Sequence, residues 1–172
     1  MATTEATLRA FFQSTRYAVV GASSNPQKFG HKGLTPCSSL YTHIVGSNHN
    51  VIVFVWYLNH NLPVTPINPA SATIDVGKKQ YPAVNALSGL ESPKETGVSI
   101  ITPPHVTLKA LGEAKDLGIP SVWLQPGTFD DEVLRYARDN FANVLAGDGG
   151  WGSEGWCILV DGERGMRSAG KL

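Results

Sequence analysis

The sequence predicts a doubly wound α/β domain, in which helices cover both faces of a parallel sheet to give a three-layer αβα arrangement. Three observations predict this fold class. Short apolar runs rich in β-branched residues alternate with helical segments, with short connections between them. The length of 172 residues matches one ordinary domain. Neither an internal repeat nor a domain boundary is visible, so we expect a single domain over residues 1–172.

The first two predicted elements are a helix and a buried strand. Residues 4–14 predict the helix because Leu8, Phe11 and Phe12 share one face at helical spacing. The run 17–22 is short and apolar and contains β-branched residues, which is typical of a strand buried on both faces of a sheet. A polar, turn-forming loop follows this strand and opens the candidate site considered below.

The later elements continue the alternation. They are, in chain order, a helix beginning near Val53 or Phe54, a strand over 62–67, short pieces over 70–95, a strand over 97–102, a helix over 106–117, a strand over 121–125 and a helix over 130–140. The last strand is supplied either by Val144 and Leu145 or by the run 157–160. Both are apolar, and the sequence leaves this choice open.

Composition excludes several classes of partner. Fourteen basic residues balance fourteen acidic ones, and no run of five basic residues occurs, so neither nucleic acid nor a membrane surface is an expected partner. Two cysteines without C-x-x-C spacing favour reduced thiols inside the cell. Because no apolar stretch is long enough for a signal peptide or a membrane span, we expect a cytoplasmic protein.

Glycine, proline and polar residues follow each predicted strand, which indicates a ligand site. In an open parallel sheet, ligands bind at the carboxyl ends of the strands, where the strand order reverses. Here those ends carry the segments 21–30, 68–69, 102–104 and 125–127. Each loop taken alone is equally well explained as simple punctuation between elements. Their joint occurrence favours a shared crevice.

The first loop has the composition of a phosphate site. Gly21 permits a sharp turn, and Ser23, Ser24 and Asn25 can donate to phosphate oxygens. Lys28 adds a positive charge. The complete set of candidate ligand-binding residues is Gly21, Ala22, Ser23, Ser24, Asn25, Lys28, Gly30, Asn68, Pro69, Thr102, Pro103 and Gln125.

Two departures from the dinucleotide fingerprint weaken an NAD interpretation. Ser23 stands where the second glycine of G-x-G-x-x-G would allow close approach of the pyrophosphate. Asn68 follows the second strand, where an NAD enzyme usually has an acid for the ribose hydroxyl. An NAD(P)-dependent oxidoreductase on the same fold is therefore the less favoured alternative.

Several of these segments resemble a known family. The run 17–23, the pair Asn25-Pro26 and the run 28–30 resemble the opening of the small CoA-binding domain family, and so do 64–69 and 121–127. That family is similar to the CoA-binding domain of the succinyl-CoA synthetase α-subunit. The resemblance extends from about Arg16 to Gly165 and implies a Rossmann-like fold that binds coenzyme A. The coenzyme's phosphates would lie over the first loop, and its 3′-phosphate would favour the absence of an acid after the second strand.

One stretch departs from the family pattern. Residues 33–52 separate the phosphate loop from the helix that should follow it, and they show no clear periodicity. We interpret this stretch as an insertion, which is either a surface loop or a translated intron.

No catalytic constellation is visible in the sequence. His105 follows a proline turn, and Cys157 lies in an apolar run that indicates an inert core thiol. We find neither a triad nor a pair of catalytic carboxylates. The sequence therefore favours a non-catalytic protein that binds a small nucleotide coenzyme, coenzyme A. A further alternative is an interaction protein with a vestigial nucleotide site.

The glycine-rich tail over 147–155 is predicted to be a loop. Trp151 and Trp156 would cap the core or, alternatively, form a lid over the pantetheine arm. The acids of this region are expected to be solvated. They are Asp148, Glu154, Asp161 and Glu163.

Overall fold

The chain is built around a parallel β-sheet. The computed structural model describes residues 5–25, 51–152 and 155–172. Five strands form the sheet in the order β2-β1-β5-β6-β7, and every neighbouring pair runs parallel. The strands are β1 (Arg16–Val20), β2 (Val64–Ile67), β5 (Thr96–Ile100), β6 (Ser121–Leu124) and β7 (Asn143–Leu145).

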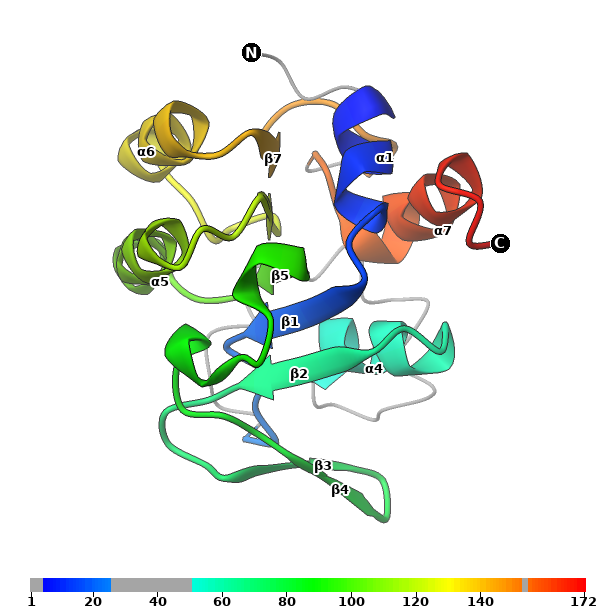
Figure 1. The fold of residues 1–172 in the computed structure, drawn as a ribbon, viewed down its shortest axis with the longest axis vertical. Coiled ribbons are helices and arrows are strands. Elements are labelled where there is room, and N and C mark those ends of the chain that lie inside the picture. Colours follow the sequence, from blue (N-terminus) through cyan, green and yellow to red (C-terminus); the bar gives the residue numbers. More distant parts are fainter. Residues whose placement is uncertain (1–4, 26–50, 153–154) are drawn as a thin grey trace.

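Helices cover both faces of this sheet, as Figure 1 shows. One face is covered by α1 (Glu5–Phe12), α4 (Ile52–Asn59) and α7 (Ile158–Ser168). The other is covered by α5 (Pro104–Asp116) and α6 (Asp131–Asn140). The predicted doubly wound, three-layer Rossmann-like fold is thereby confirmed.

Strand β1 shows why both faces need covering. Tyr17 and Val19 point into the core under α1, α4 and α7, whereas Ala18 and Val20 point into the core under α5 and α6. All four side chains are buried. A strand at the centre of a doubly wound sheet therefore has no polar face, which explains the continuous apolar run in the sequence.

The layer over the first face is rich in aromatic side chains. Phe11 and Phe12 of α1 both pack edge-on against Trp123 of β6. The layer also contains a buried polar pair: the Tyr57 hydroxyl and the Ser99 hydroxyl lie 2.8 Å apart, and burial raises the pKa of Tyr57. Packed side chains therefore fill this face, whereas a parallel sheet binds its ligands at the carboxyl edge.

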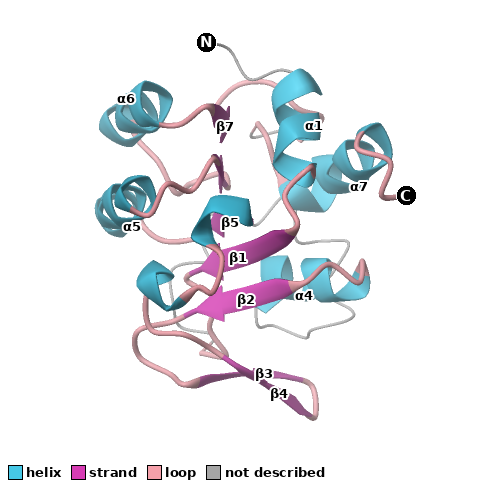
Figure 2. Cartoon of the chain, in the orientation of Figure 1, coloured by secondary structure: helices cyan, strands magenta, loops and turns pink. Residues whose placement is uncertain are grey.

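A two-stranded antiparallel hairpin lies beyond the sheet, as the secondary-structure colouring of Figure 2 shows. It consists of β3 (Thr73–Val76) and β4 (Lys79–Pro82), which fall in the stretch for which the sequence predicted only short pieces. Ile74 is fully buried and anchors the hairpin to the core. Short 3₁₀ turns follow, η3 (Leu87–Gly89) and η4 (Pro93–Glu95).

The structure decides between the two candidates for the last strand. Asn143–Leu145 forms β7, whereas Ile158 begins helix α7, so the interpretation of 157–160 as a strand is wrong. Two glycines lie inside α7, Gly162 and Gly165. A Cβ at Gly162 would fall on the Trp56 indole, and one at Gly165 would lie 2.5 Å from the Phe12 ring. These glycines let α7 approach α4 and α1 closely.

The second helix begins slightly earlier than predicted. Ile52 is the first residue of α4, and both Val51 and Ile52 are buried. These two residues of the predicted insertion therefore belong to the core. Residues 33–50 lie outside the described part of the chain.

Candidate functional site

One pocket lies where the strand order reverses. Strand β1 has β2 on one side and β5 on the other. The connection from β1 leads to β2 on one side, and the later strands β5, β6 and β7 follow on the other side, so the strand order reverses at β1 and a crevice is expected there at the carboxyl edge. A pocket of about 440 Å³ occupies this position. Its lining residues are Val20, Gly21, Ile67, Asn68, Pro69, Asn85, Ala86, Leu87, Ile101, Thr102, Pro103, Val106, Lys109, Ala110 and Glu113. Most of this wall is apolar.

Five of the predicted site residues line this pocket together: Gly21, Asn68, Pro69, Thr102 and Pro103. They come from the ends of three different strands, as the parallel topology requires. Ala22, Ser23, Ser24 and Asn25 continue the first loop next to it. Lys28 and Gly30 lie outside the described residues.

The first loop is shaped by its own side chains. Gly21 has a φ of +98° and donates its N–H to the Ile67 carbonyl. The Ser23 side chain is buried, and its Oγ accepts the Asn25 N–H at 3.1 Å. The Ser24 Oγ accepts the Asp75 N–H at 2.7 Å, which ties the loop to the hairpin. These bonds hold the part of the loop that the structure describes, residues 21–25, in a defined shape.

Asn68 joins the first loop to the second. Its Nδ2 donates to the Ala22 carbonyl at 2.8 Å, and its Oδ1 accepts the Ala70 N–H at the same distance. The side chain is buried, so both bonds are made away from water. Asn68 is therefore positioned by one donor and one acceptor, and an aspartate could supply only acceptors. Its role is to hold two site loops at a fixed separation.

We expect Asn68→Asp to destabilise the protein by about 1–3 kcal/mol, because it leaves the buried Ala22 carbonyl facing a carboxylate oxygen. Urea unfolding measures this change. The matched control is Asn85→Asp, which adds the same charge at an exposed position on the same pocket. Equal losses in the two variants would mean that charge, and not the bond to Ala22, is responsible.

The third loop is fixed by a pair of threonines. The Thr107 hydroxyl donates to the Thr102 carbonyl at 3.0 Å, and the two hydroxyl oxygens lie 2.9 Å apart. Both side chains are buried. Pro103 and Pro104 follow and begin α5, where a missing N–H costs nothing. Thr102 thus presents its methyl group, not its hydroxyl, toward Gly21.

Gln125 does not line the pocket. Its side chain is fully buried, and its Oε1 accepts the Ile158 N–H at 3.0 Å, at the first turn of α7. Its Nε2 has no hydrogen-bond partner among the described residues. The structure therefore assigns Gln125 a contact between β6 and α7.

Sequence reasoning missed the helical wall of the pocket. Val106, Lys109, Ala110 and Glu113 line it from one face of α5. Residues three and four positions apart lie on the same face of a helix, so this spacing could have identified the pocket face of α5 from the sequence. The Glu113 Oε1 accepts the Ser88 N–H at 2.8 Å and so connects α5 to η3.

The histidine and the cysteine that the sequence analysis considered for a chemical role lie outside the pocket. His105 is exposed and does not line the pocket, and Cys157 is buried in the core. In the described ranges, no group of three or more histidine, cysteine or acidic side chains could hold a metal ion. No helix in those same ranges is long and apolar enough to cross a membrane.

Comparison with known proteins identifies the chain's relatives. The sequence profile of a family described as "CoA binding domain" matches residues 15–152. A hypothetical protein from Pyrococcus horikoshii OT3 has a similar structure, with a TM-score of 0.66 and 20% identity over 96% of this chain and 94% of that one. A conserved hypothetical protein from Pyrococcus furiosus gives a TM-score of 0.59 and 24% identity over 85% and 97%. No curated protein sequence matches.

Proposed function

We propose that this chain, which belongs to the CoA-binding domain family, binds coenzyme A with its adenosine in the apolar pocket and its diphosphate over the first β–α loop. The observation that carries the proposal is the pocket's position. It opens beside Gly21, at the point where the strand order reverses, so a nucleoside inside it would have its phosphates next to the first loop.

The size and lining of the pocket support a nucleoside as its occupant. A volume of about 440 Å³ lies in the range of small-molecule sites. Ile67 and Leu87 line it from β2 and η3, and Ile101, Val106 and Ala110 line it from the end of β5 and from α5, so an apolar base could pack against side chains of several elements. The backbone N–H groups of the first loop lie beside the pocket and could donate to the phosphates of the ligand.

The contacts of Asn68 and Ser23 favour coenzyme A over NAD. NAD enzymes of this fold usually have an acid after the second strand for the ribose hydroxyl. At that place the Asn68 Nδ2 donates to the Ala22 carbonyl, and its Oδ1 accepts the Ala70 N–H. At the second glycine position, Ser23 is buried and holds the Asn25 N–H. Both positions maintain loop shape, and neither supplies the NAD contacts.

The proposal is one of binding. The titratable side chains that line the pocket, within the described chain, are Lys109 and Glu113. Glu113 is engaged by the Ser88 N–H. A nucleophile held by a neighbouring base, which covalent catalysis needs, is not formed by this pair.

We expect coenzyme A to raise the melting temperature more than NAD does at equal concentration, because a ligand that binds only the folded state stabilises it by mass action. Thermal-shift measurements with coenzyme A, acetyl-CoA, NAD and NADP test this. A larger shift with NAD would overturn the assignment.

A pocket-filling variant locates the site. Val106→Trp places an indole in the pocket and should abolish the shift with coenzyme A, whereas His105→Trp changes the exposed neighbouring residue and should leave it intact. If Val106→Trp stays folded and still responds to coenzyme A, the adenosine does not occupy this pocket.

A further inference from the structure

The rim of the pocket carries one basic side chain within the described residues, Lys109. It lies on α5 between Val106 and Glu113, on the face that turns toward the pocket. Its side chain is exposed, and it forms no ion pair with any residue of the described ranges. The ammonium group is therefore not neutralised by the part of the protein that the structure describes.

The nearest acid on the same helix face does not pair with it. Glu113 follows Lys109 by four residues, a spacing at which side chains on a helix can meet. Its Oε1 instead accepts the Ser88 N–H, and the two charged groups do not form a salt bridge. The rim thus presents the Lys109 cation next to the Glu113 carboxylate, which is hydrogen-bonded to η3.

These charges restrict where an anionic group of a ligand can lie. A phosphate dianion cannot enter the apolar part of the pocket without a large desolvation cost. It would also be repelled by Glu113. A phosphate attached to the ribose of a bound adenosine is therefore best placed at the rim, on the Lys109 side.

We infer that Lys109 is a specificity-determining residue that recognises a phosphomonoester on the ribose of the bound nucleotide, the 3′-phosphate in coenzyme A. This inference rests on the proposed function, because it places the adenosine in the pocket. Lys109 would raise the affinity for ligands that carry the ribose phosphate and would leave the affinity for ligands without it unchanged. The first loop, by contrast, would bind the diphosphate that both kinds of ligand share.

The test compares coenzyme A with dephospho-coenzyme A, which differ only in that phosphate. By isothermal titration calorimetry, the wild-type protein should bind coenzyme A about tenfold more tightly, as expected for one charge-assisted contact. Lys109→Met should reduce this preference to near unity and leave the affinity for dephospho-coenzyme A unchanged. The wild-type preference should also shrink at high salt, because the rim is exposed.

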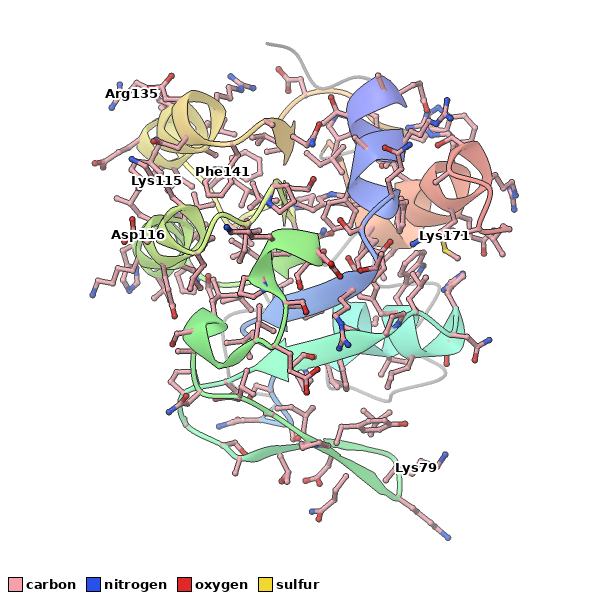
Figure 3. The ribbon with its side chains drawn as sticks, in the orientation of Figure 1. Lys79, Lys115, Asp116, Arg135, Phe141 and Lys171 are labelled. Carbon is pink, nitrogen blue, oxygen red and sulfur yellow. The ribbon has the colours of Figure 1, made fainter. Side chains whose placement is uncertain are left out.

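Lys115→Met is the matched control. Lys115, labelled in Figure 3, lies on the same helix, but its Nζ is over the Tyr136 ring of α6 and it does not line the pocket. This variant loses the same charge and should keep the wild-type preference. NADP measured against NAD forms a second arm, because the 2′-phosphate of NADP offers the same chemistry.

Each outcome decides between the two claims. A preference that survives Lys109→Met, or that falls equally in Lys115→Met, overturns the role of Lys109. Equal wild-type affinities for coenzyme A and dephospho-coenzyme A overturn it as well, while the proposed function stands. If the wild-type protein binds neither, the proposed function fails and the inference with it. A Lys109-dependent preference seen for NADP alone rules out the 3′-phosphate of coenzyme A.

Discussion

Gly21→Ala is expected to lower the affinity for coenzyme A at least tenfold and the free energy of unfolding by about 1–3 kcal/mol. Gly21 has a φ of +98°, which strains any residue with a Cβ. The added methyl carbon would also lie 2.7 Å from Cγ2 of Thr102 and 3.2 Å from Cγ1 of Ile101. Thr102 cannot easily yield, because its carbonyl and hydroxyl are both bonded to Thr107. The strain therefore falls on the loop proposed to hold the diphosphate.

Gly77→Ala separates the two sources of this loss. Gly77 also has a positive φ, +59°, but among the described residues no heavy atom beyond its two chain neighbours lies within 4 Å of the position its Cβ would take. This variant should lose stability through backbone strain alone and keep its affinity for coenzyme A. Calorimetric titration and urea unfolding of both variants make the comparison. Normal binding by a folded Gly21→Ala protein would show that the first loop does not contact the ligand.

The sequence was sufficient to predict the layers of the fold and that residues following different strands would line one crevice. Apolar runs identified β1, β5 and β6, because central strands of a doubly wound sheet are buried on both faces. Parallel strands end at the same edge, so residues that follow different strands had to meet there. Gly21, Asn68 and Thr102 do line one pocket.

The roles of individual side chains could not be predicted, because they depend on partners far along the chain. Asn68 was expected to contact the ligand, and it lines the pocket, but its hydrogen bond to the Ala22 carbonyl, 46 residues away, was not foreseen. Gln125 was expected at the ligand, but it bonds the Ile158 N–H, 33 residues away. Lys109 lies on the pocket face of α5, whereas hydrophobic periodicity reveals only the face that packs on the core.

The carboxyl-terminal tail was misjudged for a related reason. A short apolar run such as 157–160 fits a buried strand and a buried helix equally well. The run is followed by Gly162 and Gly165, whose lack of a Cβ permits the close packing of α7 on α4 and α1. Asp161 was expected to be solvated and is fully buried. Of the two tryptophans expected to cap the core, Trp156 is buried and Trp151 is 72% exposed.

Asp161→Asn is expected to lower the free energy of unfolding by about 3–5 kcal/mol, the range for breaking a buried, hydrogen-bonded ion pair. The Asp161 Oδ1 accepts the Trp151 N–H and an Arg164 N–H, each at 2.8 Å, and its Oδ2 accepts the Cys157 N–H at 3.1 Å. An amide keeps one of these two acceptor oxygens and turns an NH₂ group toward a donor. Urea unfolding measures the loss.

Glu163→Gln is the control for this substitution. Glu163 lies two residues further along α7, is exposed, and pairs with Arg167 at 2.8 Å, so its loss should cost at most about 1 kcal/mol. A comparably small effect at Asp161 would mean that its three bonds are replaced by water.

Asp161→Asn also tests the hypothesis that the tail forms a lid over the ligand. Asp161 fixes the backbone of Trp151 and Cys157, and no residue from Ala146 to Cys157 that the structure describes lines the pocket. The Asp161→Asn protein, at a temperature where it remains folded, should therefore bind coenzyme A with wild-type affinity. Reduced affinity would instead indicate that the tail covers the part of the ligand that extends beyond the pocket, and Trp151→Ala should then reproduce that loss without the loss of stability.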